Sequence, residues 1–188
     1  MAEVLLFHHA QGLTPGCHSF ADELRAAGHV VHTPDLYDGR TFTGLSEGVA
    51  YAKQVGFDTI IERGRRAAES LPDELVYAGF SLGVMPAQML AQTRPGVKGA
   101  LLFHGCIPPS EFASPWPQGV PLQIHTMEAD ELGDVDIARE LAETIATAEL
   151  FLYAGDRHLF SDNSLPHYDE SAAALLKQRV LSFLDNIE

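Results

Sequence analysis

The sequence predicts an α/β protein: a three-layer, doubly wound sandwich with about six mostly parallel strands. Six short segments carry apolar side chains at consecutive positions, which is typical of parallel strands buried on both faces. Amphipathic helical patterns separate most of these segments. Alternation of this kind favours parallel pairing through right-handed crossovers, with helices on both faces of the sheet.

The apolar segments define the expected strands, at residues 3–9, 29–35, 74–80, 99–105, 121–127 and 148–155. The helical patterns define the expected helices, at residues 15–28, 57–70, 82–93, 135–148 and 169–187. The first helix ends at Gly28, a residue suited to a helix C-terminus because it tolerates positive φ. The fourth helix repeats Ile137, Leu141 and Ile145 at four-residue spacing, which predicts one buried face.

Two connections are unusually long. Residues 36–56 show little periodicity, so we expect a loop there. Residues 106–120 contain four prolines and the only tryptophan, Trp116. Long loops in compact α/β domains often shape binding sites. We therefore expect Phe112 and Trp116 either to cover a pocket or to pack at the surface or an oligomer contact.

Length and charge restrict the classes of function. A chain of 188 residues predicts one domain, spanning residues 1–188. The net charge of −14 disfavours binding to nucleic acid or to an anionic membrane through a basic face. The amino-terminal segment has no basic region, and no apolar run approaches the roughly 20 residues of a membrane span. The two cysteines are far apart and predict neither a disulfide framework nor a structural zinc site, so we expect a reducing, cytoplasmic location.

The segment Gly79-Phe80-Ser81-Leu82-Gly83 matches G-x-S-x-G between an expected strand and an expected helix. That context is the one that a nucleophile elbow requires. The glycines are expected where backbone approaches too closely for a Cβ, in a strained turn that raises Ser81 above the sheet. The backbone N–H of Leu82 is then placed to stabilise an oxyanion. An ordinary turn with a helix-capping serine is the alternative.

A nucleophilic serine needs a base, and the base needs an orienting acid. His158 directly follows the last expected strand, and Asp130 directly follows the fifth. The chain order Ser81, Asp130, His158 is that of α/β hydrolases, and all three residues stand at carboxyl ends of strands, where open parallel sheets bind ligands. Asp134 is the rival acid, although it is also placed to cap the helix that begins near Val135.

Three stretches carry a more specific resemblance: HHAQGLTPGCHSFADELRAAGHVVHTPDLYDG, YAGFSLG and YAGDRHLF. Over nearly the whole chain, the sequence resembles the dienelactone hydrolase family of α/β hydrolases. The resemblance implies the strand order 2-1-3-4-5-6 and a single minimal α/β-hydrolase domain. It also implies that the loop after the first strand faces Ser81 at the switch point, and that Ala10 supplies the second oxyanion N–H.

The chain departs from the family's namesake enzymes at the site. They use cysteine where this chain has Ser81, a glutamate where it has His9, and an arginine where it has Asp162. Their second arginine falls in the region of residues 46–58, which contains Lys53 but no arginine. Arginine suits a substrate carboxylate because it binds in a bidentate way. We therefore expect a neutral ester, or a small acyl or amide substrate, rather than an acidic lactone.

Other residues at strand ends have less specific interpretations. We expect His9 and Gln11 to line the pocket near Ser81, and Cys106 to be a weaker candidate nucleophile because no elbow surrounds it. No H-x-x-x-H pair or Cys/His cluster indicates a metal, so no metal site is expected. Core or rim positions are expected for three further histidines: His8, His104 and His125.

The sequence thus predicts a serine hydrolase that cleaves a small ester or lactone through an acyl-enzyme, without metal or organic cofactor, as a monomer or homodimer. Two alternatives stay open. The same triad serves acyl transfer or amide and peptide hydrolysis. A non-catalytic small-molecule binding module with the same fold belongs to another class of function.

Overall fold

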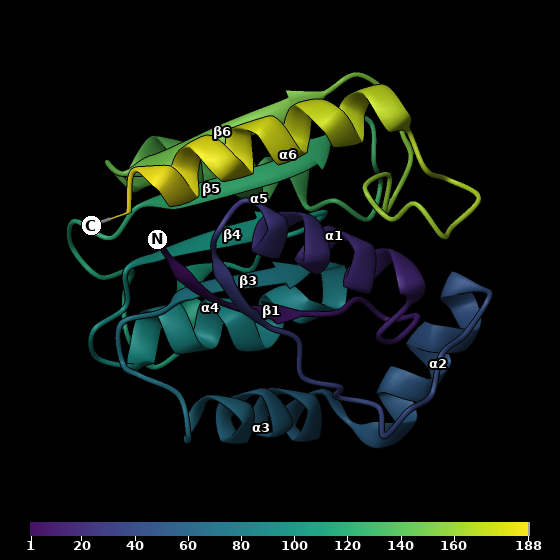
Figure 1. Ribbon diagram of the computed structural model, residues 1–188, viewed down its shortest axis with the longest axis horizontal. Helices are drawn as coiled ribbons and strands as arrows, with labels where there is room; N and C mark the ends of the chain where they lie inside the picture. The colour runs from purple at the N-terminus through teal and green to yellow at the C-terminus, as the bar shows by residue number, and fades with distance from the viewer. Residues whose placement is uncertain (188) are drawn as a thin grey trace.

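The computed structural model describes residues 1–187, and the strands in this range form one six-stranded sheet (Figure 1). The strand order is β2-β1-β3-β4-β5-β6, and neighbouring strands pair in parallel throughout. This confirms the predicted fold class and strand order. The strands are β1 (Glu3–Phe7), β2 (Val30–His32), β3 (Val76–Phe80), β4 (Gly99–Phe103), β5 (Leu122–Met127) and β6 (Ala148–Tyr153).

Helices cover both faces of the sheet. Figure 1 shows two of them in front of the strands, and their buried side chains share one hydrophobic core with that face of the sheet: α1 (Pro15–Ala26) and α6 (Glu170–Asp185). The other face has its own core, to which four helices contribute: α2 (Leu45–Val55), α3 (Phe57–Ala68), α4 (Val84–Thr93) and α5 (Val135–Thr144). The sheet is therefore the middle layer of a three-layer sandwich.

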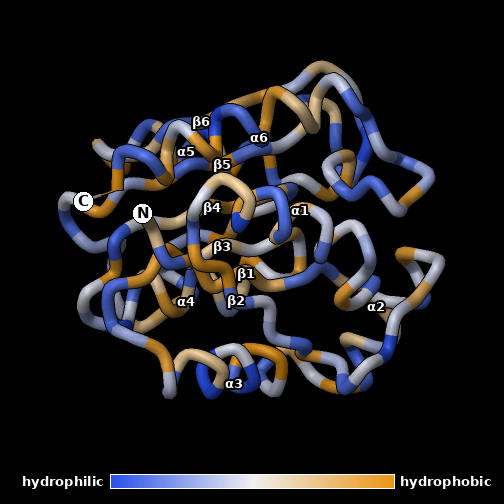
Figure 2. Tube along the Cα trace, in the orientation of Figure 1, coloured by the Kyte–Doolittle hydropathy of each residue, from blue (hydrophilic) through white to orange (hydrophobic). Residues whose placement is uncertain are grey.

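The central strands have apolar residues at consecutive positions because, as predicted, both of their faces are buried. Every residue of β3, β4 and β5 is buried, because each strand contacts helices on both sides. Figure 2 shows hydrophobic residues concentrated along these strands and hydrophilic residues on the connecting loops. Full burial of one large apolar side chain stabilises a fold by about 1.5–3 kcal/mol, so the two cores hold the strand ends rigidly.

The prediction of a loop over residues 36–56 was wrong in part, because this region contains α2 (Leu45–Val55). The buried residues of α2 are the small Gly48 and Ala52, whereas larger apolar side chains such as Tyr51 and Val55 are only partly buried against the core, so the residues that face the core most closely are not those that a hydrophobic pattern picks out. Glycine at position 48 is required for a steric reason. A Cβ at position 48 would collide with the backbone carbonyl of Ala10, in the loop after β1.

The described helices are short. The longest, α6, has 16 residues, whereas a membrane span needs about 20. Within residues 1–187, no helix is long and apolar enough to cross a bilayer.

Candidate active site

The serine turn joins β3 to α4 through a short 3-10 segment, residues 81–83. Ser81 has a φ of 47°, a left-handed conformation that costs a non-glycine residue about 1–2 kcal/mol. A Cβ on Gly83 would lie 2.5 Å from the carbonyl oxygen of Phe7 and 2.7 Å from that of His8. A Cβ on Gly79 would meet the Gly83 carbonyl. Both glycines therefore permit the close backbone approach that was predicted for this turn.

Three side chains form a continuous hydrogen-bonded chain above the turn. Ser81 Oγ lies 2.8 Å from His158 Nε2, and His158 Nδ1 lies 2.7 Å from Asp130 Oδ2. With Nδ1–H donating to the carboxylate, Nε2 is the nitrogen that accepts from the serine hydroxyl. Asp130 is 5% exposed, and its Oδ1 accepts the backbone N–H of Leu132 at 3.0 Å. This arrangement matches the relation of nucleophile, base and orienting acid in a triad.

The topology explains why residues so far apart in sequence meet here. The serine turn, Asp130 and His158 follow β3, β5 and β6, so all three stand at the carboxyl edge of the sheet. Among the described residues, His158 pairs with Asp130 and not with Asp134. Asp134 precedes α5 with a φ of 50° and makes no side-chain capping bond, and burial raises its pKa.

The loop after β1 brings a backbone amide to the same edge. Ala10 is 3% exposed, and within residues 1–187 its N–H meets no protein acceptor. Gln11 fixes the loop by donating its side-chain amide to the carbonyl oxygens of Phe42 and Thr43, each at 3.1 Å. Leu82 begins the helical segment after Ser81, so the two residues predicted to form an oxyanion hole both lie at the carboxyl edge of the sheet.

A cavity of about 600 Å³ adjoins the triad. Its wall includes His158 and Asp130, together with Gln11, Leu45 and His167. Ser81 is not among the residues that line this cavity; it is partly exposed and contacts His158, which does line it. This volume is in the range of small-molecule sites.

Three residues expected at the pocket do not line this cavity: His9, Phe112 and Trp116. Trp116 instead packs against the core on the α4 side, and its indole N–H donates to the carbonyl of Val120 at 3.0 Å. The proline-rich loop is held there by Gln92 of α4, which donates to the carbonyl of Pro109 at 3.0 Å. Tertiary contacts with α4 thus keep this loop away from the cavity wall.

Comparison with known proteins identifies the family of this chain. The model of the dienelactone hydrolase family matches residues 1–188. The chain belongs to the dienelactone hydrolase family. Its family identifies the protein as a hydrolase of the α/β-hydrolase class, whereas no curated protein matches the sequence significantly.

Solved structures with the same fold include several hydrolases. A dienelactone hydrolase-like promiscuous phosphotriesterase from metagenomic libraries is 18% identical, with a TM-score of 0.75 over 100% of this chain and 87% of the other. Dienelactone hydrolase from Anabaena variabilis is 18% identical, with a TM-score of 0.71 over 100% and 87%. Thermogutta terrifontis esterase 2, phosphoramylated by tabun, is 20% identical, with a TM-score of 0.64 over 98% and 82%. At these identities the likeness concerns the fold.

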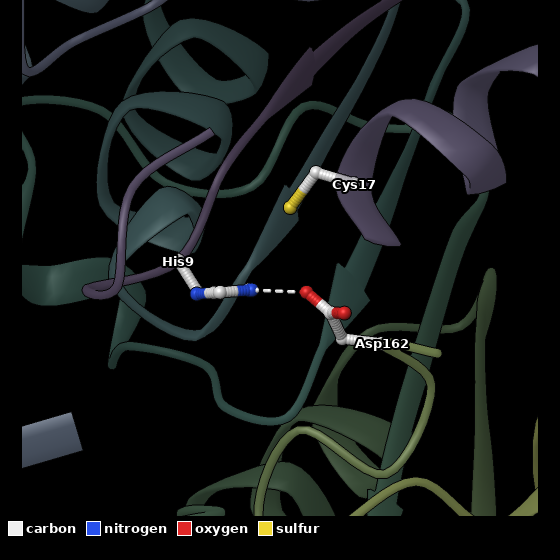
Figure 3. A group of neighbouring side chains, drawn as sticks. All are labelled: His9, Cys17 and Asp162. Carbon is white, nitrogen blue, oxygen red and sulfur yellow. Dashed lines mark hydrogen bonds and ion pairs between the residues drawn. The ribbon is translucent and has the colours of Figure 1, made fainter. Parts of the chain in front are cut away.

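His9 and Asp162, two of the positions that differ from what the family resemblance implies, contact one another. His9 Nε2 lies 2.7 Å from Asp162 Oδ2, and Figure 3 shows both side chains beside Cys17. Burial alone would lower the pKa of His9, but the hydrogen bonds with Asp162 and Cys17 outweigh this effect, so the pKa is raised to about 9. Burial raises the pKa of Asp162, but bonds from His9, Ser164 and Thr14 lower it to about 2. The two residues are 153 positions apart, so no local pattern in the sequence linked them.

The remaining strand-end histidines are buried parts of the scaffold, as expected. Burial lowers the pKa of His8 to about 4 and that of His125 to about 3, and it lowers the pKa of His104 well below 6.5. His8 accepts the backbone N–H of Leu36 at 3.0 Å, and His125 is 2.9 Å from the hydroxyl of Tyr153. These rings are therefore neutral hydrogen-bonding groups at neutral pH.

Cys106 does not have the properties of a nucleophile. Its side chain is buried, and burial raises the pKa of the thiol to about 12. Only the thiolate reacts readily, so this thiol is inert in the folded hydrolase.

Sequence analysis missed Arg157, which lines the cavity directly beside His158 in the chain. Its guanidinium donates to the carbonyl of Tyr168 at 3.1 Å and lies 3.6 Å from the carboxylate of Asp169. Glu131 and Asp156 line the same cavity. The one guanidinium in this wall is thus partly neutralised, and its position just before the expected base was the signal available in the sequence.

Proposed function

We propose that the protein is a serine hydrolase that cleaves a small neutral ester or lactone through an acyl-enzyme. The observation that carries this proposal is the chain Ser81–His158–Asp130, with contacts of 2.8 and 2.7 Å, on a left-handed serine. A serine that only caps a helix stands at the N-cap and bonds a backbone N–H of the first turn, whereas the N-cap residues of the two helical segments here are Phe80 and Gly83, and Ser81 Oγ bonds His158.

The geometry supports a two-step mechanism. As Ser81 Oγ attacks the carbonyl carbon, His158 Nε2 takes the hydroxyl proton, and Asp130 stabilises the imidazolium. The oxyanion accepts hydrogen bonds from the Leu82 and Ala10 amides. The intermediate collapses as the carbon–oxygen bond to the leaving group breaks, and His158 protonates the departing alkoxide. Water, deprotonated by His158, then attacks the acyl carbon. The bond from that carbon to Ser81 Oγ breaks, His158 returns the proton to Oγ, and the carboxylic acid leaves.

The charges around the cavity favour a neutral substrate. Arg157 is engaged by Tyr168 and Asp169, while the carboxylates of Glu131 and Asp156 share the wall. A substrate carboxylate would therefore meet like charges without a free bidentate partner. Acyl transfer and amide hydrolysis on the same triad remain separate outcomes, distinguished by adding a competing alcohol or by offering an amide analogue.

Hydrolysis of a short-chain p-nitrophenyl ester tests the proposal. We expect Ser81→Ala and His158→Ala each to lower kcat by about 10³-fold or more, to the background rate. His18→Ala is the matched control, because His18 is an exposed histidine of α1 outside the site. Turnover that survives Ser81→Ala would exclude the mechanism.

A fluorophosphonate probe separates an enzyme from a binding module. The organophosphorus chemistry named for two structural neighbours, the promiscuous phosphotriesterase and the tabun-modified esterase, supports this choice of probe. We expect one covalent adduct on the wild type and none on Ser81→Ala. Absence of both labelling and ester turnover in the wild type would favour a non-catalytic binding module.

A further inference from the structure

Two loops from opposite ends of the chain supply the parts of the proposed site. The loop after β1 carries Ala10, and the loop between β6 and α6 carries His158. Direct contacts join these loops beside the cavity. Asp162 is at the centre of them, four residues after the proposed base and tied to its turn by a backbone hydrogen bond to Leu159 of 3.1 Å.

Asp162 is a buried hub that accepts from both loops. Its carboxylate is 5% exposed and accepts from His9 Nε2 at 2.7 Å and from the hydroxyl of Thr14. Within its own loop it accepts the backbone N–H of Ser164 at 2.8 Å and its hydroxyl at 2.6 Å. Gly16 closes the hub, because a Cβ there would collide with the carboxylate. Both oxygens of this buried acid are thereby satisfied by the protein.

His9 connects this hub to the oxyanion loop through its two ring nitrogens. Nε2 contacts Asp162, while Nδ1 lies 3.2 Å from the backbone nitrogen of Gln11. The Gln11 contact favours an unprotonated Nδ1, whereas Asp162 and Cys17 raise the pKa of the ring. Both protonation states keep the Nε2–H that donates to Asp162, so the link between the loops does not depend on the charge of the ring.

A metal ion is the other use for these side chains, since one ligand atom each of His9, Cys17 and Asp162 lies within 4.8 Å of the others (Figure 3). Two ligands of a tetrahedral zinc ion are about 3.4 Å apart at the usual bond lengths. His9 Nε2 and Asp162 Oδ2 are only 2.7 Å apart and already share a proton. The spacing of these two atoms is therefore that of a hydrogen bond and not that of two ligands of one ion.

We propose that His9 and Asp162 are a positioning pair, which holds the Ala10 amide in register with His158 and so sets the turnover rate of the site. The proposal rests on the hydrolase function proposed above. Neither residue lines the 600 Å³ cavity, so the pair acts on the reacting groups and not on substrate binding. A misplacement of about 1 Å in such a site costs about 10²-fold in rate. The pair therefore affects kcat and leaves KM in place.

Asp162→Asn tests the pair without changing the size of the side chain. Each carboxylate oxygen of Asp162 accepts two hydrogen bonds. An asparagine keeps one oxygen and replaces the other by an NH2 donor, so two of the four hydrogen bonds from His9, Thr14 and Ser164 lose their acceptor. We expect kcat for a p-nitrophenyl ester to fall about 10²-fold with KM within about twofold. The matched control is Glu3→Gln, which breaks another histidine–carboxylate contact of 2.7 Å, with His32, at the amino edge of the sheet.

Gly16→Ala perturbs the same hub without changing any charge. Alanine favours helices more than glycine does, so a loss of activity in this variant is attributable to the displaced Asp162 carboxylate. We expect the same selective fall in kcat. This variant keeps the proposal testable if Asp162→Asn does not fold.

NMR gives a readout that does not need turnover. In both variants we expect the Ala10 amide and the His158 ring signals to move, whereas Glu3→Gln leaves them in place; in Asp162→Asn the pKa of His9 also falls below about 9. Folded variants with wild-type kcat and unmoved signals would overturn the positioning pair. A wild type without turnover or fluorophosphonate labelling would defeat the hydrolase proposal instead, and the NMR signals would still decide whether the pair holds the loops together.

Discussion

Acid should destabilise this protein through its buried neutral histidines, and His125 is the clearest case. Its ring lies 2.9 Å from the Tyr153 hydroxyl and 3.2 Å from Gln123 Oε1, which fits a neutral ring that accepts at Nδ1 and donates at Nε2. Burial, and secondarily the nearby charge of Arg179, lowers its pKa to about 3. The native state therefore stays unprotonated at a pH where the unfolded chain binds a proton.

Proton linkage gives the sign and the size of this change in the free energy of unfolding. Because the folded pKa lies below the unfolded value of about 6.5, stability is complete above pH 6.5 and falls as the pH drops toward the folded pKa. Each such histidine costs about 1.4 kcal/mol per pH unit, so His125 alone removes about 3 kcal/mol between about pH 6.5 and 4.5. His8 adds a similar loss because its pKa is about 4. His9, with a raised pKa of about 9, keeps its full contribution throughout this range and does not offset the loss.

Urea denaturation of wild type and His125→Gln at about pH 7 and about pH 4.5 measures the effect. We expect the free energy of unfolding of the variant to fall by about 3 kcal/mol less than that of the wild type over this range. Tyr153→Phe is the control, because it removes the hydrogen bond but keeps the imidazole and therefore the pH dependence. Equal losses in wild type and His125→Gln would refute the assignment of a neutral buried ring.

Three further predictions concern the site and its support. Asp130→Asn should lower kcat by about 10³–10⁴-fold in the ester assay, because an amide stabilises the wrong imidazole tautomer; an unaffected kcat would remove Asp130 from the triad. Gly83→Ala should lower the free energy of unfolding by about 2 kcal/mol or more, since its Cβ would lie 2.5 Å from the Phe7 carbonyl; a neutral result in urea denaturation would contradict the close approach. Neither cysteine should react with a thiol reagent in the native protein, and both should react in urea, because both side chains are buried; rapid native labelling of Cys106 would contradict its raised pKa.

The strands were predictable because burial on both faces requires apolar residues at consecutive positions. A strand such as β4 meets a helix layer on each side, so GALLF must be apolar at every position. Strand order was not accessible in this way and came from the family resemblance. Helix α2 was not predicted because its most buried positions, Gly48 and Ala52, hold small residues, and the close approach of Gly48 to the Ala10 carbonyl requires a small residue there.

The triad was accessible because parallel topology converts chain order into spatial proximity. Any residue just past a strand reaches the same edge, so Asp130 and His158 could be named from their positions alone. The contact between His9 and Asp162 was not accessible, since it depends on how two loops fold against each other. The same limit applies to Trp116, whose place is decided by the packing of its loop on α4.

Backbone strain in this chain is concentrated where the chemistry is proposed. Within residues 1–187, five non-glycine residues have positive φ, among them Asp38 in the connection after β2. The other four, Ser81, His104, Asp134 and Leu159, follow β3, β4, β5 and β6 at the carboxyl edge. At about 1–2 kcal/mol for each residue, this strain is a sizeable fraction of the free energy of unfolding of an ordinary domain, which is about 5–15 kcal/mol. It persists because the strands that end there are clamped between two cores. Residues in the middle of the strands bury apolar surface and stabilise the sheet, and that stability lets the turns at its carboxyl edge hold the serine, the imidazole and the carboxylate in one line.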